Sequence, residues 1–284
     1  MPNYIFERFE EVEESIKKLA PKIIYKYRGD WTNPYHRQLI TNQTLWFAAP
    51  RDLNDPYDIR TPFEFDVSEI ENPIFFEKLK AHFISDNLGK GYSERDINVI
   101  CENKMDEIRQ NPKAYFENKY KQIREGNIYD RVGLFSCTKN ELDETMWAHY
   151  GNNYNGFVVG FHTVELARNI LCSIGPVTYS DVIPKYSFIN SKEEDDFDLY
   201  FLKSTKWQYE QEFRFFTIGD DENVERAKKY PVECVAEVII GTKFPNDQQK
   251  EFIDTVRKIF GDKFPIYQVQ PKISGYGLAK NKLA

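Results

Sequence analysis

The stretch WQYEQEFRFF at residues 207–216 predicts a core strand that carries charged side chains on one face. Side chains two positions apart share a face of an extended chain, so Glu210, Glu212 and Arg214 are expected to project together. Tyr209, Phe213 and Phe215 are expected to project from the other face. Two carboxylates at this spacing lie roughly 7 Å apart and repel each other, and a purely structural strand has little reason to pair them. The pattern therefore indicates a functional use for the two glutamates.

The composition of the chain predicts a globular protein. Its length allows one large domain or two, and the pattern of its elements favours a single α+β domain over residues 1–284. Its 284 residues are 41% hydrophobic and 15% aromatic, which is ample for a packed core. No stretch approaches the roughly 20 apolar residues of a membrane span, and the charged N-terminal segment lacks the apolar core of a signal peptide. We therefore expect a cytoplasmic location and no membrane partner.

Charge and cysteine content narrow the classes of function. The net charge of -7 argues against a protein whose main role is to hold a nucleic-acid backbone, although transient action on a nucleic acid remains compatible with it. The chain has four widely spaced cysteines and four histidines, so neither a disulfide framework nor a zinc site is indicated. No metal site is expected.

The pattern of apolar residues, prolines and glycines predicts helices inserted into a sheet. The segment at about 68–128 is charged and helical in composition, with helix starts at Asn72-Pro73 and Asn111-Pro112. We expect it to form a three-helix insertion that caps or flanks a site, or that serves as a partner surface. Outside it the sequence predicts an N-terminal helix at 4–20, strands at 22–29, 44–50, 131–138, 156–161 and 176–180, a short helix near 141–151, and a final strand, helix and strand.

Three predicted strands carry polar residues where apolar ones would be expected. Arg28 ends the strand YKYRG, and Ser136 and Thr138 lie in the strand LFSCT. Glu210 and Glu212 precede the third. An arginine at the end of a core strand usually binds an anion or a carboxylate, because a buried unpaired charge is very costly. An ion pair at the rim of the sheet is the structural alternative for Arg28.

The order of these motifs resembles the arginine-serine-glutamate class of ADP-ribosyltransferases, in which comparable motifs line an NAD-binding cleft. That resemblance implies mixed sheets around a cleft, with NAD as a substrate. The motifs YKYRG, LWFAAPRDLNDPYD, LFSCT, MWAHYG and YEQEFRFF also resemble the bacterial family called domain of unknown function 2971, over nearly the whole chain. That second resemblance implies no established activity.

The transferase resemblance implies a role for each polar residue in the strands. A carboxylate at Glu212 would stabilise the positive charge that develops on the ribose when nicotinamide leaves. Glu210 would orient or deprotonate the nucleophile, with its pKa raised by repulsion from Glu212. Arg28 would bind the diphosphate. Ser136, with Thr138 on the same strand, would hold the nicotinamide ribose or fix Glu212.

The segment MWAHYG offers aromatic side chains near the predicted site. Trp147, His149 and Tyr150 are expected to form a wall for the nicotinamide ring. The structural alternatives are that Trp147 packs in the core and that His149 caps the end of its helix.

Three functions use the same residues. The first is an NAD-dependent ADP-ribosyltransferase-like enzyme or NAD glycohydrolase, in a toxin or phage-defence setting, with an unidentified acceptor and an antitoxin or regulator as a further partner. It predicts that Arg28, Ser136 and Glu212 converge on one cleft between two small sheets. The second is a magnesium-dependent nuclease in which Asp55 and Asp58 join the two glutamates. The third is a non-enzymatic defence-system or antitoxin-like module whose E-x-E-x-R strand is an ion-pair ladder.

Overall fold

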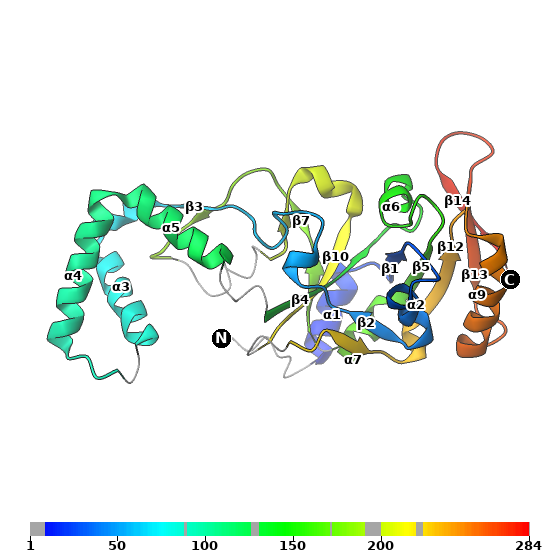
Figure 1. Cartoon of the computed structure of the whole chain (residues 1–284), viewed down its shortest axis with the longest axis horizontal. Helices are drawn as coiled ribbons and strands as arrows, with labels where there is room; N and C mark the ends of the chain where they lie inside the picture. The colour runs from blue at the N-terminus through cyan, green and yellow to red at the C-terminus, as the bar shows by residue number, and fades with distance from the viewer. Residues whose placement is uncertain are drawn as a thin grey trace.

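A mixed α+β architecture is confirmed by the computed structural model, which describes residues 9–87, 90–125, 131–170, 172–190, 200–219 and 224–283. Its centre is an eight-stranded sheet with the order β14-β13-β12-β5-β1-β4-β10-β6 (Figure 1). Neighbouring strands are antiparallel except β12 and β13, which are parallel and joined by α9 (Asn246–Phe260). The strands are β1 (Ile23–Arg28), β4 (Val132–Thr138), β5 (Phe157–His162), β6 (Ser173–Pro176), β10 (Glu212–Ile218), β12 (Val235–Ile240), β13 (Ile266–Pro271) and β14 (Leu278–Lys282).

Both faces of the sheet are covered, as alternation along β1 shows. Ile24 belongs to a large apolar cluster, whereas Tyr25 and Tyr27 point into a second cluster on the other face. Apolar side chains from four helices join the first cluster, and α6 (Glu144–His149) supplies the second. The four helices are α1 (Phe9–Leu19), α2 (Pro34–Thr41), α7 (Thr163–Ile170) and α9. None of the helices among the described residues is long and apolar enough to cross a membrane.

The sheet is nearly divided between β1 and β4. Strand β1 pairs with β5 at all six of its residues, but it pairs with β4 only through Tyr25 and Thr138. On the far side, β4 pairs with β10 at seven positions. The sequence predicted two small sheets, and the structure instead shows a single sheet whose two parts separate beyond that residue pair. This separation leaves room for a pocket in the middle of the sheet.

The described residues also form three two-stranded sheets and several 3₁₀ helices, and some of these elements contribute residues to the pocket. The sheet of β7 and β9 places Lys203, and η4 places Glu210. The small strands are β2 (Thr44–Trp46) with β11 (Ala227–Lys229), β3 (Glu64–Phe65) with β8 (Lys185–Tyr186), and β7 (Thr178–Tyr179) with β9 (Leu202–Lys203). The 3₁₀ helices are η1 (Pro50–Asp52), η2 (Val67–Glu71), η4 (Thr205–Glu210) and η5 (Val232–Cys234).

The predicted helical insertion is present as α3 (Pro73–Asp86), α4 (Glu94–Gln110) and α5 (Pro112–Glu125). The starts of α3 and α5, at Asn72-Pro73 and Asn111-Pro112, are those predicted from the sequence. The Asn72 side chain caps α3 by accepting from the Ile74 N–H, and Ser93 forms a capping box with Asp96 at the start of α4.

The insertion does not cap the pocket in the described part of the chain, whereas its expected roles of flanking a site or serving as a partner surface stay predictions. The three helices stand to one side of the sheet (Figure 1), and the described residues that line the pocket come from other segments. The insertion also does not need the sheet to bury its aromatic side chains. Phe75 and Phe116 are buried in a separate cluster, where Phe116 stacks on Phe65 with ring centroids 4.3 Å apart. The insertion therefore has a small core of its own.

Candidate active site

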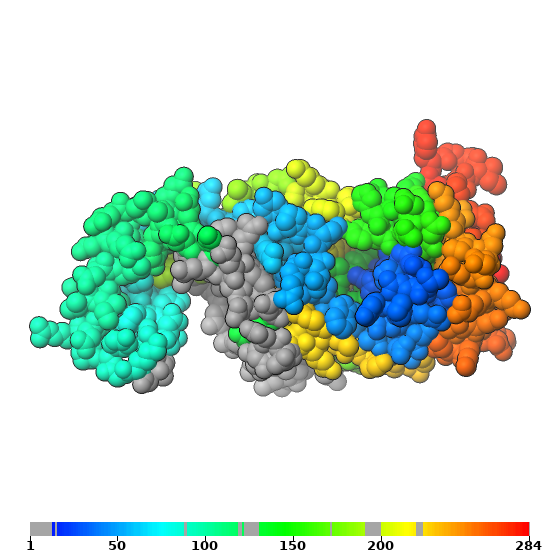
Figure 2. All heavy atoms as spheres, viewed as in Figure 1, coloured from blue at the N-terminus to red at the C-terminus, as the bar shows by residue number. Residues whose placement is uncertain are grey.

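A pocket of about 290 Å³ opens where β1 separates from β4. In Figure 2 the surface is hollowed between the segment at 46–58, in light blue, and the segment around α6, in bright green. Arg28, Ser136 and Glu212, which the sequence predicted to converge, all line this pocket from the neighbouring strands β1, β4 and β10. The cavity lies at the lower end of the size range of small-molecule sites, which is about 300–1,000 Å³.

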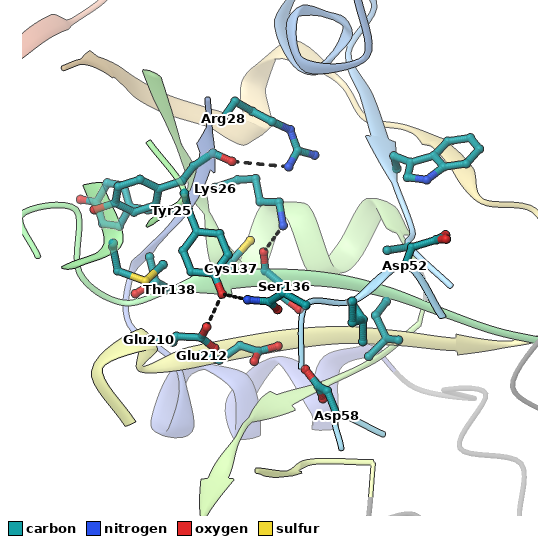
Figure 3. A pocket seen from close by; sticks show the side chains of 18 of the residues that line it. Tyr25, Lys26, Arg28, Asp52, Asp58, Ser136, Cys137, Thr138, Glu210 and Glu212 are labelled. Carbon is teal, nitrogen blue, oxygen red and sulfur yellow. Dashed lines mark hydrogen bonds between the residues drawn. The ribbon is translucent and has the colours of Figure 1, made fainter. Parts of the chain in front are cut away.

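Two cationic side chains form one end of the pocket. Lys26 and Arg28 alternate along β1, and Figure 3 shows both on the side of the pocket opposite to Glu210 and Glu212. The Lys26 Nζ donates to the Ser136 carbonyl oxygen at 2.6 Å, across the gap between β1 and β4. Within the described residues, no Asp or Glu oxygen lies within ion-pair distance of either cation. The buried Arg28 Nε has no hydrogen-bond partner there. We call this pair the cation end.

The surroundings of Lys26 and Arg28 disfavour the charged form of each side chain. Burial lowers the pKa of Lys26 to about 8, and repulsion from Arg28 adds to the shift. Burial also lowers the pKa of Arg28 to about 10. An anion placed between the two side chains would supply the missing counter-charge, and guanidinium and ammonium donors match phosphate oxygens. The cation end is therefore suited to bind a phosphate group or a carboxylate.

A buried network of charges forms the opposite end of the pocket. It consists of three carboxylates and two cations, and the side chain of each is at most 6% exposed. Its members, which we call the charge network, are Asp58, Lys203, Glu210, Glu212 and Arg214. Three carboxylates against two cations leave a net charge of -1 when every group is ionised. The pocket is therefore bipolar, with positive charge at one end and negative charge at the other.

Glu212 is held on all sides within the charge network. Its Oε1 accepts from Arg214 Nε at 2.8 Å, and its Oε2 accepts from Arg214 Nη2 at 2.9 Å and from Lys203 Nζ at 3.3 Å. Burial alone would raise the pKa of Glu212, but Arg214, Lys203 and a hydrogen bond from the Ser136 side chain together lower it well below its usual range. Glu212 is therefore held as a carboxylate at neutral pH, and its oxygens are already occupied.

Glu210 has a different environment from Glu212. Its Oε2 accepts from Lys203 Nζ at 2.6 Å, and its Oε1 accepts from the Tyr150 hydroxyl, which in turn accepts from Asn54 Nδ2 at 2.9 Å. Burial raises the pKa of Glu210, and the charge of Glu212 adds to the shift in the direction predicted from the sequence. Glu210 is thus the carboxyl group in the pocket that is best suited to exchange a proton.

The prediction that Glu210 shares a strand with Glu212 and Arg214 is wrong. Strand β10 begins at Glu212, and Glu210 ends the 3₁₀ helix η4. Between them Gln211 has a left-handed backbone with φ of 42°, which turns the chain and breaks the alternation of the strand. The two carboxylates still meet, because both accept hydrogen bonds from Lys203.

A tight turn at 151–156 fixes the end of β1 that carries Arg28. Asn152, Asn153 and Tyr154 all have positive φ, which is uncommon for residues other than glycine. The turn packs directly on the backbone of its neighbours: a Cβ at Gly156 would overlap the Arg28 carbonyl oxygen. Because Tyr150 immediately precedes this turn, the same packing positions its hydroxyl beside Glu210.

The aromatic wall expected from MWAHYG is present only at Tyr150, which lines the pocket. Trp147 is fully buried, its Nε1 donates to the Glu141 carbonyl oxygen, and its ring packs edge-on against Tyr27 at 5.2 Å. The structural alternative for Trp147, that it packs in the core, is therefore correct. His149 is exposed, lies 3.1 Å from the Tyr209 hydroxyl and is not among the residues that line the pocket. Thr138 lines the pocket, but its hydroxyl accepts from the Asn140 N–H in a turn.

Among the pocket residues that the sequence analysis did not single out, three bear directly on the chemistry of the site: Lys26, Lys203 and Trp46. Lys26 lies two positions before Arg28 in a β-rich segment, so the pattern that drew attention to Arg28 also applied to it. Lys203 follows the apolar pair Phe201-Leu202 on a strand of only two residues, which gives little signal. Trp46 is the exposed member of β2, and alternation along LWF would have predicted that exposure.

The structure brings together only part of the acidic cluster expected of a nuclease. Asp58 lies 3.2 Å from Lys203 Nζ and 2.8 Å from Arg214 Nη2, close to both glutamates. Asp55 instead accepts from the Tyr57 N–H in a local turn and does not line the pocket. Over the described part of the chain, no three His, Cys, Asp or Glu side chains gather in a way that could hold a metal ion. The carboxylates that would bind magnesium are paired with Lys203 and Arg214.

Comparison with protein-family models gives a match over part of the chain. The model of the family described as Protein of unknown function (DUF2971) matches residues 146–215. That range contains Tyr150 and every member of the charge network except Asp58, while the cation end lies outside it. No curated protein and no solved structure matches the chain.

Proposed function

We propose that this protein is an NAD-dependent ADP-ribosyltransferase-like enzyme that cleaves the bond between nicotinamide and ribose. The observation that carries the proposal is the bipolar pocket. NAD has a positively charged nicotinamide ring and a negatively charged diphosphate, so the two ends of the pocket complement the two parts of the molecule. Arg28 and Lys26 would bind the diphosphate, and the charge network would face the nicotinamide ribose.

Cleavage of the glycosidic bond requires stabilisation of positive charge at the end of the pocket that the charge network forms. As nicotinamide leaves with the electron pair of the glycosidic bond, positive charge moves from the ring to the ribose, where the net negative charge of the network stabilises it. Glu210, as carboxylate, would then accept the proton of the attacking water or acceptor. Ser136 and Arg214 would hold Glu212 in place, so Glu212 contributes a fixed charge rather than a free oxygen.

Binding of NAD to the pocket tests the first step of this proposal. Calorimetric titration should detect NAD and ADP-ribose binding to the wild-type protein. Arg28→Met should weaken both by roughly 10- to 100-fold, the range for a lost charged hydrogen bond. The matched control is Arg37→Met, which removes an arginine whose partner is Glu251 on the surface and which does not line the pocket. Equal affinity of wild type and Arg28→Met for NAD and ADP-ribose would contradict the binding of the diphosphate at the cation end.

The cation end also predicts how binding depends on pH. Lys26 is charged below its pKa of about 8 and neutral above it, so affinity for ADP-ribose should fall as the pH rises from 7 to 9, by up to about tenfold. Arg28 keeps its charge over this range, and burial holds the pKa of Cys137 near 12. Lys26→Arg should bind with little change between these pH values. Affinity that falls equally in both proteins would assign the effect to another group.

A second function is favoured by the closure of the charge network. Each of its carboxylates already has a cationic partner within 3.3 Å, as a purely structural cluster would. Such a protein would bind a phosphorylated ligand at the cation end without reaction. It would then bind NAD and ADP-ribose with similar affinity, and NAD would be recovered intact after long incubation.

A further inference from the structure

The aromatic side chains that line the pocket differ in what they can offer a ligand. Tyr25 and Tyr27 are at most 6% exposed and belong to the apolar cluster under α6. The Tyr150 hydroxyl is engaged by Glu210 and Asn54. Trp46 is 46% exposed, and its ring pairs with no other aromatic ring in the described part of the chain. The indole of Trp46 is therefore the aromatic surface that is open to a ligand.

Trp46 is exposed for a reason that lies in its strand. In β2, Leu45 points into the main apolar cluster, so its neighbour must project to the other side. There Trp46 lies on the wall formed by the segment from β2 through η1, together with Ala48, Leu53 and Asn54. This places a large apolar ring in water at the rim of a charged pocket. An exposed ring of this size beside a pocket is more informative than an exposed aliphatic side chain.

The size of the pocket determines which part of the ligand reaches the rim. At about 290 Å³, at the lower end of the range for small-molecule sites, the cavity is too small to enclose a whole dinucleotide. If the nicotinamide ribose faces the charge network and the diphosphate lies at the cation end, the adenosine must extend beyond them. A planar base that leaves the cavity needs a flat apolar surface, and the indole of Trp46 provides one.

We propose that Trp46 is the stacking platform for the adenine base of the ligand. This inference rests on the proposed function, because the order of nicotinamide, diphosphate and adenine along the pocket follows from binding NAD. Stacking on Trp46 contributes to affinity and does not take part in bond cleavage. The platform therefore selects adenine-bearing ligands over those that carry only the nicotinamide half.

The test compares two ligands with two variants at Trp46. NAD carries adenine, and nicotinamide mononucleotide has the same reactive half without it. Trp46→Ala should weaken NAD binding on the order of tenfold in calorimetric titrations and leave nicotinamide mononucleotide binding unchanged. Trp46→Phe, which keeps an aromatic face, should retain most of the NAD affinity. Because Trp46 is half exposed, both variants should fold, and their melting temperatures verify this.

The outcomes separate this inference from the proposed function. Equal weakening of both ligands by Trp46→Ala, or no weakening of either, would overturn the platform even if NAD is cleaved. A different result is that NAD is bound but never cleaved, and that Trp46→Ala weakens the binding of NAD and AMP but not of nicotinamide mononucleotide. In that case the platform stands while the enzymatic proposal fails. If the wild-type protein binds neither NAD nor AMP, both proposals fail. A fluorescence change of the indole on adding AMP, lost in Trp46→Phe, would support the platform independently.

Discussion

Replacing Lys203 with methionine is expected to destabilise the protein by about 3–5 kcal/mol at pH 7, the range for one partner removed from a buried ion pair. Lys203 Nζ lies 3.2 Å from Asp58, 2.6 Å from Glu210 and 3.3 Å from Glu212. Without it, three buried carboxylates would share Arg214 as their remaining cation in the network. Methionine has a similar volume, so the loss of charge rather than a cavity would dominate the effect.

Chemical denaturation of Lys203→Met at pH 7 and pH 5 measures this effect. The variant leaves carboxylates whose pKa is raised in the folded state, so the folded protein binds more protons and its stability should partly recover as the pH falls. In the wild type the raised pKa of Lys203 keeps it charged across this range. The matched control is the exposed Lys206→Met, which removes the same charge three residues away. A difference of less than about 1 kcal/mol between Lys203→Met and this control would contradict the account of the network.

Replacing Glu210 with glutamine is expected to reduce the rate of nicotinamide release by about 10²- to 10⁴-fold, the range for a lost general base. Glutamine keeps the shape of the side chain and can still accept from Tyr150 or Lys203, but it cannot take a proton. The wild-type rate should rise with pH along a limb above 4.5, because burial raises the pKa of Glu210 and the carboxylate is the active form. Glu210→Gln should lack that limb.

Two variants serve as controls for Glu210→Gln. Glu144→Gln changes an exposed glutamate of α6 that does not line the pocket, and it should leave the rate unchanged. Tyr150→Phe removes the hydroxyl whose hydrogen bond lowers the pKa of Glu210, so it should move the limb to higher pH and also lower the rate through misplacement of the base. A pH profile of Glu210→Gln that keeps the wild-type limb would assign the base to another residue.

The helices and the buried strands could be predicted from the sequence because their signals are local. Asn72 and Ser93 mark the starts of α3 and α4 through capping, and β5 and β12 are mainly apolar segments, although β12 includes Glu237. The order of the strands has no such signal. β1 and β4 meet at Tyr25 and Thr138, more than a hundred positions apart, and nothing in either segment shows that they part beyond this pair.

The candidate site could be predicted only in part, for the same reason. Arg28, Ser136 and Glu212 stood out as polar residues in strands, and the structure does bring them to one pocket. The position of Glu210 depended on Gln211, whose left-handed backbone gives no signal because Gln is not a typical residue there. Lys203 lies on a two-residue strand, which gives little local signal. Its role in the site depends on tertiary contacts with Asp58, Glu210 and Glu212, which the sequence does not show.

The measurement that tests the central claim most directly is the release of nicotinamide from NAD by the purified wild-type protein, followed by chromatography, beside Arg28→Met and Glu210→Gln. The account predicts that the wild type releases nicotinamide in step with loss of NAD. It also predicts that Arg28→Met requires more NAD to reach the same rate and that Glu210→Gln is slower even at saturating NAD. Intact NAD after prolonged incubation with folded wild-type protein, with and without added protein or nucleic-acid acceptors, would contradict the claim that the bipolar pocket cleaves NAD.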